Sequence, residues 1–338
     1  MKRCLPLLLC LALLLCGCAG KNETCERFSR TYFDAFDTAI TLTCYTADEA
    51  TFAETAAAFE TELWRLNDIF DLYNPHESVT GLYALNAAGG AWLEVEPELY
   101  TLLSDCLSWR ATGGERVNIA LGNMLTLWHD YREAGEAVPP LEDLRRAAAH
   151  ASLDAIELDA EGGRVRLTDP EVRLDLGAVA KGWSVERLAE LLEARCPDYL
   201  IDAGGNIRAG KRAHDAKNVW SVGVTDPFDP SGLLLVLNVT DLSAVTSGGY
   251  QRYYEVDGVR YHHLIDPDTL MPANYVAQTT ILTRDSGLAD FLSTTTFLLP
   301  YEAGRALIDR LDGVEAIWVL NDGTVEMTEG AKPLIQER

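Results

Sequence analysis

Apolar residues recur along this 338-residue chain with both helical and strand periods. Helical spacing predicts helices over 47–70, 97–109, 141–150, 178–195 and 286–298. Short apolar or alternating runs predict strands at 40–44, 165–167, 172–174, 199–202, 220–225, 233–239, 250–256, 259–264, 279–282 and 316–320. No repeat or low-complexity linker divides these elements. We therefore expect an α+β (mixed α/β) fold in which two intimately packed lobes form one catalytic unit.

The first residues have the pattern of a secretion signal. Lys2 and Arg3 precede an apolar run from Leu5 to Leu15, which is too short to span a bilayer as a mature helix. The run ends in Leu15-Cys16-Gly17-Cys18, which favours a bacterial lipobox over an ordinary cleaved signal with incidental cysteines. We expect residues 1–17 to be a lipoprotein signal peptide, Cys18 to carry the lipid, and residues 18–27 to tether residues 28–338 to the extracytoplasmic face of the membrane.

Charge and cysteine usage narrow the chemistry. The formal net charge of −24 does not suit nucleic-acid binding, which requires Lys and Arg to neutralise phosphates. Any phosphate ligand would need a metal ion or a local basic cluster. Beyond Cys18 the cysteines are scattered, which argues against a zinc site or a redox dithiol. The compartment permits a disulfide, but the sequence does not choose a pairing.

The segment 175–182, Asp-Leu-Gly-Ala-Val-Ala-Lys-Gly, is predicted to be a strand end, a glycine turn and a helix start. Helix N-termini present free N–H groups and favour anions, and Lys181 adds a positive charge one turn in. The alternative is a plain strand-to-helix turn with a surface lysine. The segment by itself supports both interpretations equally.

Asp290 and Thr294 lie four residues apart on a predicted helix and therefore share one face. A carboxylate with a hydroxyl is a hard oxygen pair that suits Mg²⁺, with phosphate and water completing the octahedron. The alternative is a helix whose Thr294 bonds back to its own turn. The apolar neighbours of the pair predict a buried helix, in which an unpaired Asp290 would be costly, and this favours a metal ligand.

Two other strand ends carry polar groups. His262 and His263 are adjacent on a predicted strand and face opposite ways, so only one enters a given cleft. The side chain that enters would have a pKa suited to general-base work. Thr246-Ser247-Gly248 offers hydroxyls and a close backbone approach at another strand end.

Six motifs in this order, behind a lipobox, resemble those of the ApbE family, the FAD:protein FMN transferases. They are Phe36-Asp37-Thr38, Asp175-Leu176-Gly177-Ala178-Val179-Ala180-Lys181-Gly182, Asp202-Ala203-Gly204-Gly205-Asn206, Thr246-Ser247-Gly248-x-Tyr250, His263-Leu264-Ile265-Asp266-Pro267 and Asp290-x3-Thr294. The chain departs from the family pattern at Thr269-Leu270, where Thr-Gly is usual.

The resemblance implies a role for each matched position. It implies Mg²⁺ held by Asp290, Thr294 and the backbone carbonyl of Ala178, and it selects His263 as the residue near the reaction centre. It also implies a set of FAD contacts: Phe36, Tyr73, Val117, Asn118, Asp175, Lys181, Thr246, Ser247, Gly248 and Leu264. Val117 and Asn118 stand where the family often has a Phe-Asp pair.

The implied activity is transfer of FMN from FAD to a Thr or Ser hydroxyl of an acceptor protein, with release of AMP. The expected acceptors are flavoprotein subunits of membrane electron-transfer complexes. One alternative is an FAD pyrophosphatase that gives FMN and AMP with the same metal. Another is a non-catalytic lipoprotein that binds flavin or a transported solute.

Overall fold

The computed structural model describes residues 25–212 and 218–337. The predicted signal peptide, Cys18 and most of the tether lie outside these ranges. Within the described part of the chain, every helix is too short or too polar to cross a membrane.

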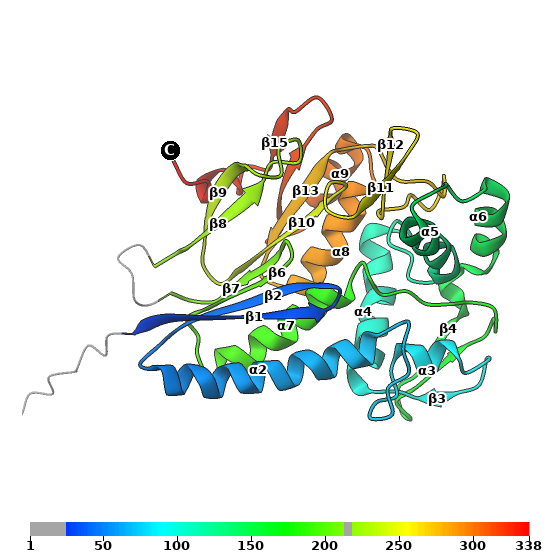
Figure 1. Ribbon diagram of the computed structural model, residues 1–338, viewed down its shortest axis with the longest axis horizontal. Helices are drawn as coiled ribbons and strands as arrows, with labels where there is room; N and C mark the ends of the chain where they lie inside the picture. The colour runs from blue at the N-terminus through cyan, green and yellow to red at the C-terminus, as the bar shows by residue number, and fades with distance from the viewer. Residues whose placement is uncertain (1–24, 213–217, 338) are drawn as a thin grey trace, which may run out of the picture.

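An eight-stranded antiparallel sheet forms the centre of the molecule (Figure 1). In spatial order its strands are β1 (Glu26–Ala35), β2 (Thr38–Thr46), β6 (Tyr199–Ala203), β7 (Asn206–Ala209), β10 (Leu242–Gly248), β13 (Gln278–Thr283), β14 (Glu315–Val319) and β15 (Val325–Met327). Every residue of β13 is buried, because other elements cover both faces of the sheet there.

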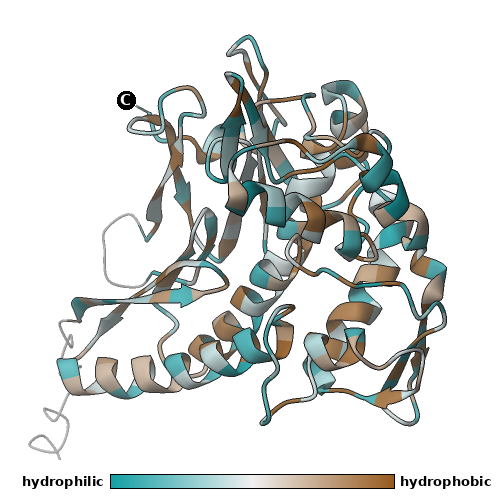
Figure 2. Cartoon of the chain, turned by 45° about the vertical axis from the view of Figure 1, so that its right-hand side comes forward, coloured by the Kyte–Doolittle hydropathy of each residue, from teal (hydrophilic) through white to brown (hydrophobic). Residues whose placement is uncertain are grey.

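One face of the sheet is covered by helices α2 (Glu49–Phe70), α7 (Ala180–Glu193) and α8 (Ser286–Phe297), with α4 (Pro97–Gly113) beside them (Figure 1). The buried positions of α2 follow helical spacing: Phe52, Ala56, Phe59, Leu63, Leu66 and Phe70. Apolar and polar segments accordingly alternate along this helix in Figure 2. The helix starts at Asp48, whose carboxylate accepts the Thr51 N–H at 2.8 Å.

Two smaller cores complete the fold. The hairpin of β8 (Trp220–Thr225) and β9 (Leu233–Val239) packs with the other face of the sheet. A third cluster joins α5 (Gly122–Ala134) and α6 (Leu141–Ala147) to the hairpin of β11 (Tyr253–Val256) and β12 (Val259–His262). The remaining elements are α3 (Leu82–Asn86), β3 (Leu93–Glu94), β4 (Ile156–Asp159), β5 (Arg164–Leu167) and α9 (Tyr301–Ile308). The predicted mixed α and β fold is confirmed.

The strand predicted at 172–174 is wrong. Its only ladder contact is an isolated bridge between Arg173 and Leu121. The side chain of Asn86 takes the place of a neighbouring strand, because its oxygen accepts the Leu174 N–H at 2.8 Å and its NH₂ donates to the Leu174 carbonyl at 2.9 Å. β1 was not predicted, because most of its side chains are exposed and its sequence lacks a clean alternation.

The contact between α7 and α8 depends on Gly182. A Cβ at this position would lie 2.3 Å from the Asp290 Cβ and 2.5 Å from the Ser286 carbonyl oxygen. Gly304 is also helical, but a Cβ there would meet its nearest atom, Trp318 Nε1, at 3.5 Å, an ordinary contact. The two glycines therefore form a matched pair for testing how closely α7 and α8 must approach.

We predict that Gly182→Ala lowers the free energy of unfolding by about 1–3 kcal/mol, because the helices must separate. Gly304→Ala should raise it by up to about 1 kcal/mol, because alanine is the better helix former. Denaturant titration of both variants measures the difference. Equal effects from the two substitutions would contradict the close approach.

Candidate active site

The site is organised around one hydrogen bond between α7 and α8. Gly182 is the third residue of α7, so its N–H is one of the helix-start donors that have no carbonyl partner within the helix. This N–H donates to Asp290 Oδ2 at 2.7 Å. Asp290 is thereby fixed against the start of α7, and Ala178 lies just before that helix. The predicted metal ligands Asp290 and Ala178 therefore come from two segments that the fold holds together.

Asp290 is buried, and the half-buried Lys181 lies close enough to act on its charge. Burial raises the pKa of the Asp290 carboxyl, and the charge of Lys181 and the Gly182 N–H only partly offset this effect. Burial likewise lowers the pKa of Lys181, although Asp290 and Asp202 favour its charged form. The carboxylate is thus short of compensating positive charge, which a bound cation would provide.

Hydroxyl groups line the space next to Asp290. Thr295 and Thr296 donate to carbonyls of their own helix, at 2.8 Å and 2.7 Å. Thr294 lies one turn after Asp290, and its hydroxyl is 3.4 Å from the Ser247 hydroxyl on β10. The alternative in which Thr294 serves only its own turn is therefore disfavoured.

Thr279 adds a further polar atom to this space. It stands opposite Ser247 in the ladder between β10 and β13, so both side chains point to the α8 face. Its hydroxyl is buried and has no hydrogen-bond partner among the described residues. Such an orphaned oxygen fits a ligand or water in this space.

The donor set fits magnesium. Carboxylate, hydroxyl and carbonyl oxygens are the hard ligands that Mg²⁺ prefers, and Mg²⁺ usually keeps waters and substrate phosphates as its other ligands. Within residues 25–212 and 218–337, no group of three or more His, Cys, Asp or Glu residues could hold a metal by itself. A metal at Asp290, Thr294 and Ala178 would therefore depend on substrate oxygens.

The three residues 246–248 divide between the two faces of the sheet. Ser247 faces α8, where its hydroxyl is 2.8 Å from that of Ser293. Thr246 faces the other way and pairs with the Thr280 hydroxyl at 2.8 Å. Gly248 has no room for a side chain, because a Cβ would meet Tyr250 Cε1 at 2.4 Å. Of these three residues, the structure brings only the Ser247 side chain to the metal pair; the FAD contacts of Thr246 and Gly248 stay predictions.

The structure separates the two histidines by their hydrogen bonds. His262 Nε2 donates to the Ala273 carbonyl at 2.8 Å, and its Nδ1 accepts the Leu264 N–H at 3.2 Å. Both ring nitrogens of His262 are therefore committed to the fold. His263 Nδ1 donates to the Arg252 carbonyl at 3.3 Å, which leaves Nε2 as the acceptor nitrogen of a neutral ring.

Positive charge surrounds His263. Burial, followed by Arg252 and His262, lowers the pKa of His263 to about 3. Arg252 also acts on the charge of Lys181. Arg132, from α5, contributes to the same field at His263. In a chain of net charge −24, this is the local basic cluster that a phosphate ligand requires.

Arg252 also fixes the turn that carries Phe36. Phe36 and Asp37 form the two-residue turn between β1 and β2 with φ of 51° and 55°, a conformation that favours glycine or asparagine. Arg252 donates to the Asp37 carbonyl at 2.7 Å, and the Phe36 N–H donates to Asn67 Oδ1 at 3.0 Å. These bonds hold a strained turn beside the segment that leads to His263.

Tyr73 and Asp175 belong to a second group of residues. The Tyr73 ring lies 5.1 Å from that of His129 on α5, measured between centroids, and is half exposed. Burial, and next the charge of Asp175, raises the pKa of Tyr73 to about 12. Burial raises the pKa of Asp175, against the Gly177 N–H, Arg173 and His129. Tyr73 and Asp175 are therefore neighbours, as a shared ligand requires.

Sequence reasoning missed the arginines and histidine around this site. Arg252 stands two residues after Tyr250, just beyond the quoted motif. His129 and Arg132 lie three residues apart on α5, and Arg132 Nη2 contacts His129 Nδ1 at 2.8 Å. The sequence did contain a signal for this pair, because two basic residues at helical spacing are unusual in so acidic a chain.

Three residues with predicted FAD contacts also have structural partners within the protein. Val117 is buried in the main core. The Asn118 amide donates to the Ala151 carbonyl at 2.8 Å and accepts the Ala120 N–H at 2.9 Å. The Leu264 carbonyl accepts the Ala273 N–H at 3.0 Å. Asn118 does border a pocket of about 240 Å³. FAD contacts by Val117, Asn118 and Leu264 stay predictions.

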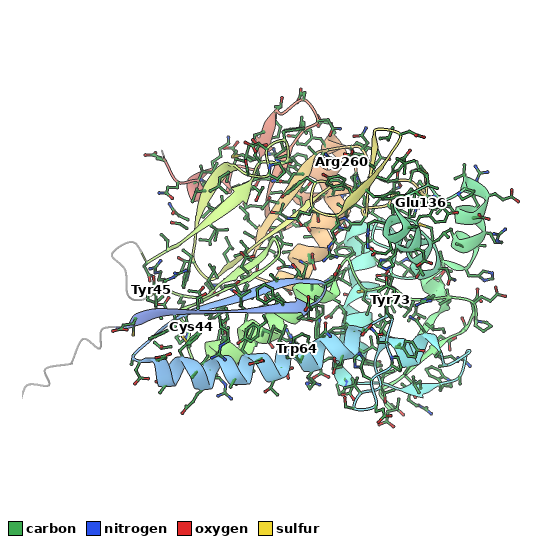
Figure 3. All side chains as sticks on the ribbon, viewed as in Figure 1. Cys44, Tyr45, Trp64, Tyr73, Glu136 and Arg260 are labelled. Carbon is green, nitrogen blue, oxygen red and sulfur yellow. The ribbon has the colours of Figure 1, made fainter. Side chains whose placement is uncertain are left out.

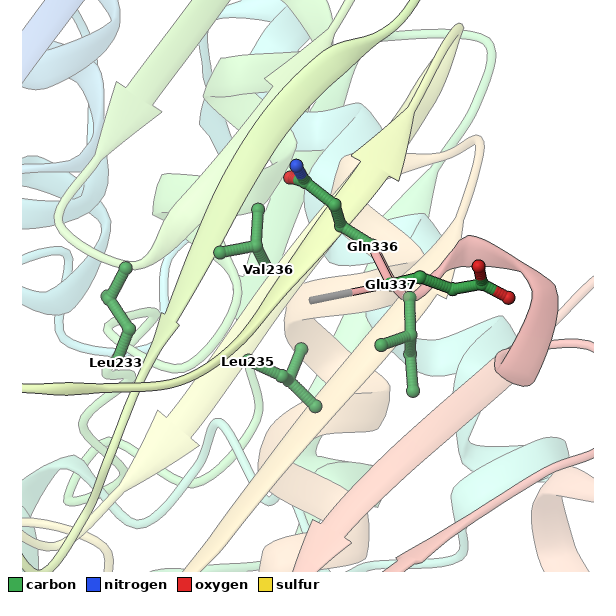
Figure 4. A pocket seen from close by; sticks show the side chains of 6 residues that line it. Leu233, Leu235, Val236, Gln336 and Glu337 are labelled. Carbon is green, nitrogen blue, oxygen red and sulfur yellow. The ribbon is translucent and has the colours of Figure 1, made fainter.

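A separate pocket of about 440 Å³ lies between β9 and the C-terminal residues (Figure 4). Its lining consists of Leu233, Leu235, Val236, Ile335, Gln336 and Glu337. It contains no cation and none of the predicted site residues. Its chemistry therefore does not match an anionic ligand.

Known proteins resemble this chain over most of its length. The ApbE family model matches residues 36–318. A Treponema pallidum protein named FAD:protein FMN transferase is 36% identical over 288 residues, which cover 78% of this chain and 79% of that protein. A Klebsiella pneumoniae protein with the same name is 31% identical and covers 69% of this chain and 72% of its own length. The crystal structure of the ApbE protein of Thermotoga maritima superposes with a TM-score of 0.82 at 26% identity, covering 92% of this chain and 100% of that one.

The fold and the site thus define a protein of the flavin-transferase class. The chain belongs to the ApbE family.

We predict that the His263 ring stays neutral from pH 8 to pH 5, because burial and the two arginines lower its pKa to about 3. His150 is the internal control, since its hydrogen bond to Asp169 raises its pKa above the usual 6.5. Histidine NMR titration of the ligand-free protein distinguishes the two residues.

The lowered pKa of His263 also makes the free energy of unfolding depend on pH. The unfolded chain binds the His263 proton more readily than the folded protein does. The contribution of His263 to the free energy of unfolding is therefore full above pH 6.5 and decreases as the pH falls toward 3. A midpoint for His263 near 6.5 would show that its ring is solvated and that the described environment is wrong.

Proposed function

We propose that this chain transfers the FMN moiety of FAD to a Thr or Ser hydroxyl of an acceptor protein and releases AMP. The observation that carries the proposal is the junction of Asp290 with residues 175–182, because it brings the matched metal and FAD motifs into one site. Support also comes from relatives named FAD:protein FMN transferase that cover more than two thirds of the chain. Flavoprotein subunits of membrane electron-transfer complexes are the proposed acceptors.

The pyrophosphate of FAD would bind where positive charge gathers in this acidic protein. Lys181 offers a cation in the first turn of α7, where the helix dipole favours anions. Asp290, Thr294 and the Ala178 carbonyl would hold Mg²⁺, which when bound offsets charge on the pyrophosphate and stabilises the leaving AMP phosphate. Tyr73 and Phe36 would contact the flavin ring.

His263 would accept the proton of the attacking hydroxyl at Nε2. Its pKa in the ligand-free site is too low for an efficient base. Bound pyrophosphate brings negative charge next to Arg252 and Arg132 and therefore raises this pKa toward a useful range. The base would thus become effective when substrate is present, and the remaining residues act by positioning and charge stabilisation.

We predict that Asp290→Asn and Thr294→Val each lower the rate of flavin transfer by about 100-fold or more, because both remove metal ligation from the developing phosphate charge. Thr296→Val is the matched control, since the Thr296 hydroxyl serves only its own helix. Protein, FAD, Mg²⁺ and a folded acceptor are incubated, and covalent flavin fluorescence is read on a denaturing gel.

The alternatives give different products in the same assay. A pyrophosphatase would release free FMN and AMP at the same rate with or without acceptor. A flavin carrier or solute-binding lipoprotein would leave FAD intact and would not respond to Asp290→Asn. No fluorescent acceptor band, with FAD bound and the acceptor folded, would overturn the transferase proposal.

We also propose that a lipid on Cys18 anchors the protein to the extracytoplasmic face of the bacterial membrane, supported by the pattern Leu15-Cys16-Gly17-Cys18. Labelled palmitate should enter the wild-type protein and the Cys16→Ala control but not Cys18→Ala, because only Cys18 becomes the acylated residue. Label in Cys18→Ala, read by autoradiography of the purified protein, would contradict this assignment.

A further inference from the structure

The structure brings together two cysteines that are far apart in the sequence. Cys44 lies on β2, and Cys196 lies between α7 and β6. Both are buried, with exposed fractions of 0% and 4%. Their thiols are in hydrogen-bonding contact, with Cys44 on the donating side. The Cys196 Sγ also lies 3.5 Å from the carbonyl oxygen of Tyr45, the residue after Cys44.

Regular backbone structure fixes this contact from both sides. Cys44 stands opposite Tyr199 in the ladder of β2 and β6, and the Tyr45 N–H extends the pairing to the Asp198 carbonyl at 3.0 Å. The Cys196 N–H bonds to the Leu192 carbonyl at 2.7 Å, at the end of α7. The two thiols are therefore neighbours because a sheet and a helix place them there.

The other described cysteines are not part of this contact. Cys106 is buried within α4, and Cys25 stands at the start of β1. The structure thus selects the pairing of Cys44 with Cys196, which the sequence left open. It also separates the pair from the flavin site, since Cys44 and Tyr73 are labelled in different parts of Figure 3.

We propose that Cys44 and Cys196 are a disulfide-forming pair that is oxidised in the exported protein. This inference rests on the proposed extracytoplasmic location, where disulfides persist. The oxidant is a disulfide, carried by a thiol oxidase or by oxidised glutathione. One cysteine thiolate attacks an oxidant sulfur and releases the other oxidant sulfur as a thiol. The second cysteine thiolate then attacks the sulfur of the first cysteine and releases the second thiol, so two electrons and two protons pass to the oxidant.

Both thiols are buried in the folded protein. Because both sulfurs are covered once β2 and β6 have paired, the exchange belongs to folding. The bond would join β2, which follows the Phe36 turn, to the segment that leads into β6 and Asp202.

The first test is peptide mapping of the full-length protein. The protein is purified from membranes in detergent after alkylation of accessible thiols under denaturing, non-reducing conditions. Trypsin should yield residues 31–65 linked to residues 196–208, a species that reductant separates. In parallel, the reduced chain is refolded with oxidised glutathione, which tests the pairing independently of where the protein resides.

Linked peptides from both preparations support the proposal. Linkage after refolding only would overturn the extracytoplasmic oxidation and leave the pairing intact. Two alkylated cysteines after refolding with oxidised glutathione would overturn the pairing itself.

Thermal unfolding provides the second readout. Reductant should lower the unfolding midpoint of the oxidised protein by about 4 °C or more, because the bond closes a long loop. Cys106→Ser should keep this sensitivity to reductant, and the double variant Cys44→Ala/Cys196→Ala should lose it. Because the pair lies away from the flavin site, the double variant should retain flavin transfer. An oxidised protein whose midpoint does not respond to reductant would contradict a stabilising bond.

Discussion

The hydrogen bond from the Gly182 N–H to the Asp290 carboxylate is the constraint on which the rest of the site depends. It joins segments 108 residues apart and is possible only because Gly182 has no side chain between the helices. This bond orients a buried carboxylate, and it holds the segment that contains Ala178 and Lys181 beside the acid. Substrate, metal and protein are thereby able to share one small volume.

Electrostatics explains why this protein needs such a closed arrangement. With a formal net charge of −24, its surface repels anions at long range. The described site contains a local group of cations, in which Arg252 and Arg132 act on His263, and Asp290 and Asp202 act on Lys181. Burial disfavours the charged forms of Asp290 and Lys181. A substrate with two phosphates and a divalent cation would supply partner charges to these groups. The same charge complementarity would contribute both to the binding energy and to the selectivity of the site.

The two adjacent histidines have different hydrogen-bond partners. Both ring nitrogens of His262 bond to backbone groups, and its ring packs edge-on against Phe297 with 5.5 Å between the ring centroids. It therefore holds the chain after β12 in place. His263 donates with Nδ1 to the Arg252 carbonyl, which leaves Nε2 as the acceptor nitrogen of the ring. Arg252 also supports the strained turn at Phe36 and Asp37, so one residue links His263 to that turn.

The sequence by itself determined the local elements and the chemistry of the motifs. Helical spacing found α2 and α8, and the four-residue spacing placed Asp290 and Thr294 on one face, because both are properties of short stretches of chain. Only the tertiary structure decided which motif faces which. It replaced the predicted strand at 172–174 with hydrogen bonds from the Asn86 side chain, brought Ser247 against α8, added Arg252 and Arg132, and brought Cys44 next to Cys196. These outcomes depend on strand register, burial and contacts between distant segments, which no local pattern encodes.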